Sequence, residues 1–391
     1  MCPAILVFCI MFKKVLCVFS GAQLDGLFNW IGQILPDCRM TPVTYLKGHQ
    51  SGDLVFEDFM SPGSLLRHVK PDLILFRSIS SYHEIALNQC AQQKGIPTVL
   101  IGHGDMPPLS AQNMISVNKP STNDRVERLR HVLNFYFLSA PISCWADRFK
   151  YLMAARNTGN PYLAAKAPKR PLHLANKALV LNEEAEETMI RHYGYAHEDV
   201  VVMGDPQGEN IKDVSISQGY VLFVDTDLSS LKELLEDVYD PWYELFSHLF
   251  CILPPEASIL IRLHPQTPAD KYLFVQNIPG VSISYDRSVA EDLSGAALVC
   301  GFRSTLLSLA LAMDKPVLLA DNWDTYFPAF PPIADGLYIK TSDIHDKLTP
   351  SPWPKPSTLD PVRLDMYKKI RGFGLPSRKI ALDVLASLKK K

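Results

Sequence analysis

The sequence lacks a long hydrophobic run, an excess of charge of either sign and any low-complexity tract. Its 391 residues carry a formal net charge of −2, so no basic field indicates a nucleic-acid partner. The apolar residues 1–12 are too few to span a bilayer, and no basic segment precedes them as in a secretory signal. We therefore expect a cytoplasmic protein, starting at Met1 or Met11. Peripheral attachment to the inner membrane stays open through local patches such as residues 389–391.

Sequence motifs that indicate reactive side chains or bound metals are also scarce. The eight cysteines form no C-x-x-C pair. Cys17 and Cys300 lie inside apolar patterns, so buried free thiols in a reducing compartment are the natural interpretation. There is no P-loop, no cluster of metal ligands and no Ser-His-Asp pattern. We therefore expect chemistry that needs no metal or cofactor.

Apolar strands alternate with helical segments along both halves of the chain. In the first half the pattern predicts strands at residues 15–19, 71–76, 96–101, 177–182 and 199–203. In the second half it predicts strands at residues 219–224, 258–261, 281–284, 297–300 and 315–319. Continuous apolar strands separated by helices are typical of parallel sheets covered on both faces.

The length suits two α/β domains. We predict a Rossmann-like N-terminal domain at 1–206, a linker at 207–218 and a Rossmann-like C-terminal domain at 219–358. A helical tail at 359–391 is expected to pack back on the first domain. The aromatic-rich residues 125–153 are expected to form a broken helix that packs under the first sheet.

Polar residues gather where predicted strands of the second half end. Arg262-Leu263-His264-Pro265 closes one strand, and Gly301-Phe302-Arg303-Ser304-Thr305 joins another to a helix. Open parallel sheets bind ligands at the carboxyl ends of their strands. His264 can donate to a phosphate, and Ser304 with Thr305 adds hydroxyls beside the free N–H groups of a helix start. An ordinary N-cap and a loop-bonded histidine are the structural alternatives.

Four neighbouring residues extend this candidate phosphate and nucleotide site. Arg262 either adds positive field or pairs with an acidic neighbour. Arg303 either pairs with a carboxylate in a two-bond contact or is solvated. Pro265 fixes the turn after the histidine, and Asn322, after the last clear strand, can reach a ribose.

The order of these motifs resembles that of GT-B glycosyltransferases that use CMP-activated acidic sugars. Gly204-Asp205-Pro206 comes first, His264-Pro265 and Ser304-Thr305 follow, and Lys315-Pro316-Val317 comes last. The resembled group includes bacterial sialyltransferases, polysialyltransferases and the Kdo transferases of capsule and O-antigen assembly. In those families a His-Pro motif and a Ser-Ser or Ser-Thr motif hold the CMP phosphate. The resemblance implies that role for His264, Ser304 and Thr305.

Transfer also needs a carboxylate, and Asp225 and Asp227 follow the first strand of the second half. A carboxylate either deprotonates the acceptor in an inverting transfer or attacks the anomeric carbon in a retaining one. Retaining Kdo transferases of the resembled group use an aspartate nucleophile, which favours Asp225. Turn closure by Asp225 and helix capping by Asp227 are the alternatives. Glu183 is a reserve carboxylate, and the family's acidic pair followed by glycine has no match here.

The resemblance implies an α/β protein of GT-B fold, with two Rossmann-like domains facing a central cleft. Gly102-His103-Gly104 is expected to line the acceptor wall of that cleft, although a simple turn explains the same residues. The implied reaction transfers Kdo or a sialic-type sugar from CMP to a bacterial surface glycan, LPS O-antigen or capsule, on a lipid-linked acceptor. UDP-sugar and CDP-glycerol transferases are alternatives, as is a non-catalytic glycan- or partner-binding module. The sugar, linkage, stereochemistry and oligomeric state are not determined by the sequence.

Overall fold

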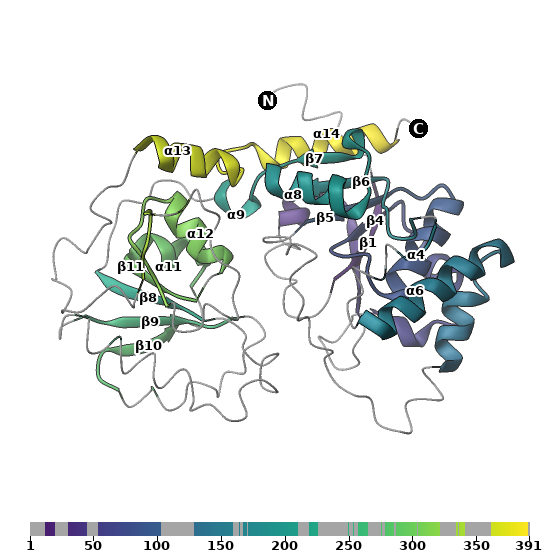
Figure 1. Cartoon of the computed structure of the whole chain (residues 1–391), viewed down its shortest axis with the longest axis horizontal. Helices are drawn as coiled ribbons and strands as arrows, with labels where there is room; N and C mark the ends of the chain where they lie inside the picture. The colour runs from purple at the N-terminus through teal and green to yellow at the C-terminus, as the bar shows by residue number, and fades with distance from the viewer. Residues whose placement is uncertain are drawn as a thin grey trace. The chain divides into compact units, whose positions relative to one another are not determined.

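The chain forms two compact units, each with its own sheet and core (Figure 1). The first comprises Met1–Gly204 with Pro376–Lys391, and the second comprises Asp205–Leu375. The computed structural model describes residues 12–19, 30–44, 54–102, 129–158, 164, 167–169, 171–209, 219–225, 249, 253, 257–264, 275, 278–284, 287–302, 304–320, 334, 336–340 and 361–389.

The first unit is built on a seven-stranded, parallel sheet in the order β3-β2-β1-β4-β5-β6-β7. Its strands are β1 Lys14–Val18, β2 Arg39–Thr44, β3 Leu54–Val55, β4 Leu73–Phe76, β5 Thr98–Ile101, β6 Lys177–Val180 and β7 Val200–Val202. The chain runs from β1 outward to β3 and then crosses to β4, so the strand order reverses between β1 and β4. Such a reversal is the topological switch point of a Rossmann-like sheet.

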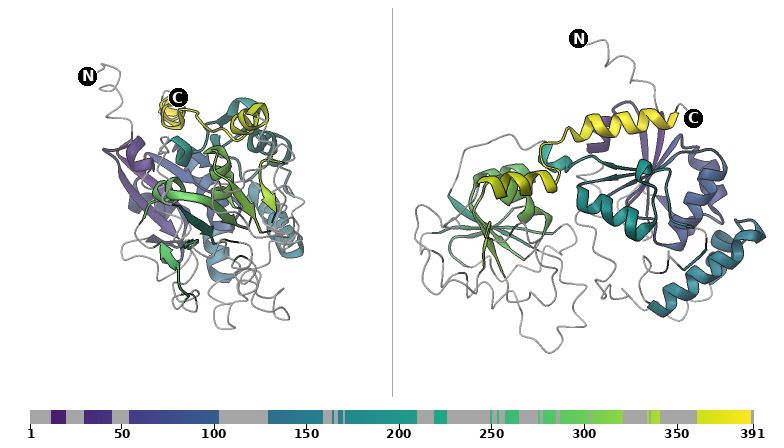
Figure 2. Two further views of the ribbon diagram at one scale, coloured as in Figure 1. Left: turned by 90° about the vertical axis from the view of Figure 1, so that its left-hand side faces the viewer. Right: turned by 45° about the horizontal axis from the view of Figure 1, so that its top comes forward.

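Both faces of this sheet are buried, because alternate residues of each strand point to opposite sides. Leu16 and Val18 lie in one core cluster, and Val15 and Cys17 lie in the other. The first cluster is covered by α3 Pro62–Val69, α4 Tyr82–Gln93, η3 Val132–Phe137, α6 Trp145–Thr158, α8 Glu183–Thr188 and η5 Met189–Tyr193. The second is covered by residues 30–35 and by α14 Ser377–Lys389 (Figure 2). Short turns η2 Phe56–Asp58, η4 Ile142–Cys144 and η6 His197–Asp199 connect these elements.

The second unit repeats the arrangement on a six-stranded parallel sheet, in the order β10-β9-β8-β11-β12-β13. Its strands are β8 Tyr220–Val224, β9 Ile259–Arg262, β10 Val281–Ser284, β11 Ala296–Gly301, β12 Val317–Leu319 and β13 Ile339–Lys340. Its helices are α9 Pro206–Glu209, α11 Val289–Gly295, α12 Thr305–Ala312 and α13 Pro361–Ile370. The last three contribute to the core on one face of the sheet, and Leu249, Leu253 and Val275 belong to the core on the other.

These two parallel sheets confirm the predicted α/β fold class, and all ten predicted strands are present. The pattern missed β2, β3, β13, α3 and α11. β2 was hidden by Pro42, which interrupts strand patterns because it has no N–H to donate. Pro42 is tolerated in β2 because the neighbouring strand β3 pairs only with Val43 and Thr44 and does not reach Pro42.

The expected helical tail forms two helices, α13 and α14. Gly372 and Gly374 adopt positive φ angles of 69° and 83°, and Pro376 follows two positions after Gly374, so α13 does not continue into α14. α13 places Leu364 and Tyr367 in the core of the second unit, whereas α14 belongs to the first unit. Residues 207–209 of the linker predicted at 207–218 belong to α9, and the rest of it lies outside the described residues.

Cys17 and Cys300 are fully buried free thiols, as the sequence led us to expect. Burial away from water raises the pKa of both thiols above the ordinary value, because the thiolate is poorly solvated there. Both groups therefore behave as small apolar side chains of the sheet cores.

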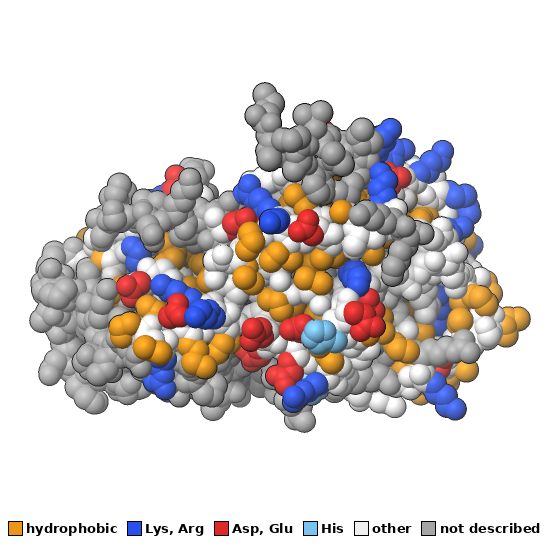
Figure 3. Space-filling view, turned by 90° about the horizontal axis from the view of Figure 1, so that it is seen from above, with side chains coloured by type: hydrophobic (Ala, Val, Ile, Leu, Met, Phe, Trp, Pro, Cys, Tyr) orange, Lys and Arg blue, Asp and Glu red, His pale blue; other side chains and the backbone are white. Residues whose placement is uncertain are grey.

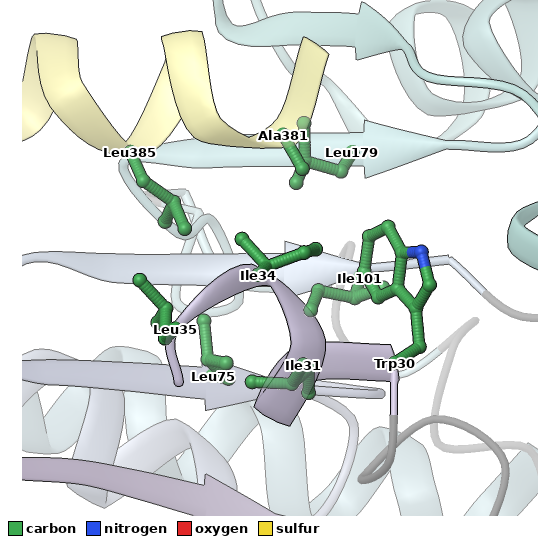
Figure 4. A pocket seen from close by; sticks show the side chains of 9 residues that line it. All are labelled: Trp30, Ile31, Ile34, Leu35, Leu75, Ile101, Leu179, Ala381 and Leu385. Carbon is green, nitrogen blue, oxygen red and sulfur yellow. The ribbon is translucent and has the colours of Figure 1, made fainter. Parts of the chain in front are cut away.

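α14 is held to the first sheet by apolar packing. Ala381 and Leu385 point from α14 toward a small cavity shared with residues 30–35 and the sheet (Figure 4). The other residues that line it are Trp30, Ile31, Ile34, Leu35, Leu75, Ile101 and Leu179. All are hydrophobic, so α14 completes one covered face of the sheet.

Leu385→Ala is expected to destabilise the first unit by about 2–4 kcal/mol, because it deletes buried methyl groups beside an existing cavity. Urea unfolding of the full chain measures the change, and Lys379→Ala, on the exposed side of the same helix, is the control. Equal stability of the two variants would contradict this docking of α14.

Candidate functional site

The candidate site lies at the carboxyl edge of the second sheet, at its switch point between β8 and β11. The strand register places Arg262, Val224 and Gly301 side by side in one row across β9, β8 and β11. Asp225, His264 and Ser304 follow these strand ends within three residues. The topology therefore brings four of the sequence-predicted residues, Asp225, His264, Gly301 and Ser304, to the edge where such sheets bind ligands.

Asp225 ties the ends of β8 and β9 together. Its backbone N–H donates to the Arg262 carbonyl at 2.9 Å, and its Oδ2 accepts from the His264 backbone N–H at 3.1 Å. The aspartate is only 2% exposed, whereas His264 is half-buried. The carboxylate thus closes the turn beyond the strands and fixes the backbone that carries the histidine.

Arg262 pairs with an acidic neighbour, which is one of the two roles expected for it. Its Nη1 lies 2.5 Å from Oδ2 of the fully buried Asp292 and 3.0 Å from the Arg287 carbonyl. Ser284 donates to the same Asp292 oxygen at 2.7 Å, and Arg287 Nε lies 3.2 Å from the other. This network ties β9 and β10 to α11 behind the site. A contact of Arg262 with a nucleotide stays a prediction.

Gly301 is a glycine because β8 passes too close for a side chain. A Cβ at this position would lie 2.6 Å from the Val224 carbonyl oxygen. Beyond it, buried Phe302 leads to Ser304, which caps α12 by accepting from the Leu307 N–H at 3.3 Å. A hydroxyl that accepts in this way keeps its own proton to donate. Capping and ligand binding are therefore compatible at Ser304.

The remaining candidates fall elsewhere or outside the described part of the chain. His103, Gly104, Asp227, Pro265, Arg303 and Asn322 are outside it, as is the side chain of Thr305. Gly102 closes β5, where its N–H donates to the Leu179 carbonyl at 2.7 Å. Glu183 is exposed in the first turn of α8, where a carboxylate complements the helix dipole.

At the corresponding edge of the first sheet, sequence reasoning named the residues after β5 but missed the loop after β4, at the switch point. Glu84 is 4% exposed and accepts from Ser78 Oγ at 2.8 Å, Ser80 N–H at 2.7 Å and Ser81 N–H at 2.8 Å. These bonds fix the loop between β4 and α4. The pattern Ser81-x-x-Glu84 before an apolar helix is a capping box, so this signal was present in the sequence.

Metal ligands do not gather at either edge within the described segments, where no group of three His, Cys, Asp or Glu side chains is placed to hold an ion. That the transfer reaction needs no metal ion stays a prediction.

No family model and no curated protein matches the chain. Among solved structures, the wall teichoic acid polymerase TagF matches at 11% identity and a TM-score of 0.51, over 97% of this chain and 89% of that one. The glycotransferase of kitacinnamycin matches at 14% identity and 0.49, over 96% and 99%. UDP-GlcNAc 2-epimerase from Neisseria meningitidis matches at 14% and 0.47, over 96% and 100%. The likeness to TagF supports a GT-B fold built from two Rossmann-like units.

Asp292→Ala is expected to lower the free energy of unfolding of the second unit by about 3 kcal/mol or more, because it leaves the Arg262 cation partly buried without its carboxylate. Urea unfolding measures the loss. Asp365→Ala, which removes an exposed carboxylate from α13, should cause no measurable loss. If the two variants are equally stable, the network behind the site is not structural.

Proposed function

We propose that this chain is a GT-B glycosyltransferase whose nucleotide-sugar donor binds at the carboxyl edge of the second sheet. The observation that carries the proposal is the gathering of Asp225, His264, Gly301 and Ser304 at the switch point of that sheet. A histidine, a hydroxyl and a helix start are groups that stabilise phosphate. The GT-B fold supports the assignment as an analogy of fold.

The chemistry of transfer assigns a role to each group. As the bond between the sugar and the phosphate oxygen breaks, negative charge grows on the nucleotide phosphate. His264 donates a hydrogen bond or a proton to it, and Ser304 and the N–H groups at the start of α12 share the charge. Asp225 holds the His264 backbone in place. Because these donors are positioned before the reaction, little reorganisation is needed during it.

For the donor we propose a CMP-activated acidic sugar of the Kdo or sialic type. CMP carries one phosphate, which a single histidine and one helix start can serve. Arg303 and Thr305 would complete the site, with Arg303 paired to the sugar carboxylate. The acceptor is a hydroxyl of a bacterial surface glycan on a lipid carrier, and it binds the first unit near Gly102–Gly104.

A nucleoside diphosphate donor is the second candidate. TagF structures include a histidine variant soaked with CDPG that matches this chain with a TM-score of 0.50. Transfer from a CDP- or UDP-linked donor would use the same edge of the second sheet, with additional backbone donors for the second phosphate.

Thermal unfolding with CMP, CDP, UMP and UDP tests the site. A ligand at about 100 times its Kd adds about 2.7 kcal/mol, which raises the Tm of a unit of this size by about 5–10 °C. We expect that shift with CMP for the wild type and its loss in His264→Ala. His192→Ala, an exposed histidine of the first unit, should keep it.

Three other outcomes of the thermal unfolding experiment would change the proposal. A larger shift with CDP or UDP would replace CMP by a diphosphate donor. An equal CMP shift in His264→Ala would remove the histidine from the site. If no nucleotide shifts the Tm, the chain is a non-catalytic binding module.

Asp225→Asn separates a positioning role of Asp225 from a role as nucleophile or base. The amide oxygen can still accept from the His264 N–H, so a positioning role predicts CMP release from a CMP-sugar within about threefold of the wild type. A nucleophile or base predicts a fall of about a hundredfold or more. Asp225→Ala, which removes the acceptor, should lower CMP release under either role. Normal CMP release by Asp225→Ala would exclude both.

A further inference from the structure

Six large hydrophobic side chains are exposed on one segment of the first unit, residues 129–158, which we term the helical arm. The arm comprises the helical residues 129–137, η4 and α6. The exposed side chains are Leu129 (70%), Leu133 (50%), Leu138 (58%), Ile142 (80%), Phe149 (58%) and Met153 (40%). Across the described residues only three other large hydrophobic side chains are exposed to this degree, Met60, Val362 and Met366. The arm therefore concentrates exposed apolar surface.

The exposed side chains are not a sign of a loosely packed segment, because the inner face of the arm is firmly anchored. Arg148 is 1% exposed and donates to Gln89 Oε1 on α4 at 2.6 Å and to Ser139 Oγ at 3.2 Å. Its guanidinium lies 4.7 Å from the centre of the buried Tyr136 ring. The aromatic packing expected for this region is therefore found on its inner side, while Phe149 points outward.

The outer face of the arm is cationic as well as apolar. Phe149, Met153 and Arg156 follow one another at helical spacing on α6, with Lys150 beside them, and Arg130 adjoins Leu129. Arg130, Lys150 and Arg156 are all exposed. The one carboxylate within residues 129–158, Asp147, is 9% exposed and accepts from the Lys169 backbone N–H at 3.1 Å. No exposed acidic side chain thus offsets these cations within the arm.

We propose that the helical arm docks the protein on the surface of an anionic lipid bilayer. Apolar side chains flanked by Lys and Arg on one helix face are the composition that settles at the boundary between headgroups and acyl chains. Each nearby cation adds attraction to anionic lipid. Hydrophobic side chains gather at the right-hand end of the first unit, the end where Figure 1 draws the arm (Figure 3). Within the part of the chain that is described, no helix has the length and apolarity to cross a bilayer, so docking here is peripheral.

Charge favours a bilayer over a second copy of the chain. In a two-fold symmetric dimer the same patch faces itself, so the three cations of one arm would meet the three of its partner. No exposed carboxylate of the arm would compensate them. An anionic bilayer supplies the opposite charge and accepts the apolar side chains.

The docking surface is also linked to the carboxyl edge of the first sheet. Tyr151, on the inner side of α6, donates its hydroxyl to the Ser80 carbonyl in the loop that follows β4. That loop is the one fixed by Glu84. Docking does not depend on the identity of the donor nucleotide, so it can be tested without a substrate.

Co-sedimentation of the full chain with vesicles tests the proposal. Binding to vesicles of phosphatidylcholine alone is compared with binding to vesicles that also contain phosphatidylglycerol. Both are measured in low salt and in high salt. We expect strong binding to the anionic vesicles, weakened by salt. Phe149→Glu with Met153→Glu should lower the partition coefficient tenfold or more, and Lys150→Glu with Arg156→Glu about tenfold or more.

The matched control is Val362→Glu with Met366→Glu, because these side chains are exposed at 75% and 52% with the same spacing on α13. The control should bind vesicles like the wild type. The melting curve of each variant reports whether it is folded.

Equal binding by the arm variants and the control, or no binding of wild type to anionic vesicles, would overturn the proposal. A concentration-dependent mass in light scattering that the arm variants abolish would instead make the arm a self-association surface. Since the vesicles carry neither donor nor acceptor, these results are independent of whether the protein transfers a sugar.

Discussion

Burial of both faces of each parallel sheet is the constraint on which the rest of the structure depends. Strands such as β8 and β11 are apolar on both sides, so the polar side chains nearest to them lie beyond the strand ends. Because the strand order reverses between β8 and β11, the loops that follow these two strands diverge, and this leaves room for a ligand between them. The position of the proposed site at the carboxyl edge therefore follows from the burial of both faces of the sheet.

Two buried carboxylates then make that edge rigid. Asp292 pairs with Arg262 and Arg287 behind β9, and Asp225 joins the end of β8 to His264. Removing a carboxylate from water is costly unless charges or N–H donors compensate it, and both are compensated. The site therefore has a histidine backbone that is held before any ligand arrives. Fixed donors of this kind are what stabilise charge that develops on a departing phosphate.

The sequence predicts most of this fold because apolar runs are a local signal. All ten predicted strands exist, and the carboxyl ends of β8, β9 and β11 were correctly expected to carry polar residues. The partner of Arg262 was not predictable, because Asp292 lies thirty positions further along the chain and meets it only once β9 packs beside α11. Pro42 shows the opposite limit, because the local signal against a strand was overridden by the tertiary register of β2 and β3.

The arm connects the two proposals in physical terms. A hydroxyl carried on a lipid is confined to the plane of a membrane, so an enzyme docked on that membrane meets it at a raised effective concentration. The arm is part of the first unit, in which the acceptor is proposed to bind, and Tyr151 bonds it to the loop at that unit's switch point. A docked arm would thereby hold this edge close to the lipid surface. A water-borne acceptor would gain nothing from such a surface, so membrane binding by the arm would favour lipid-linked acceptors over free glycans.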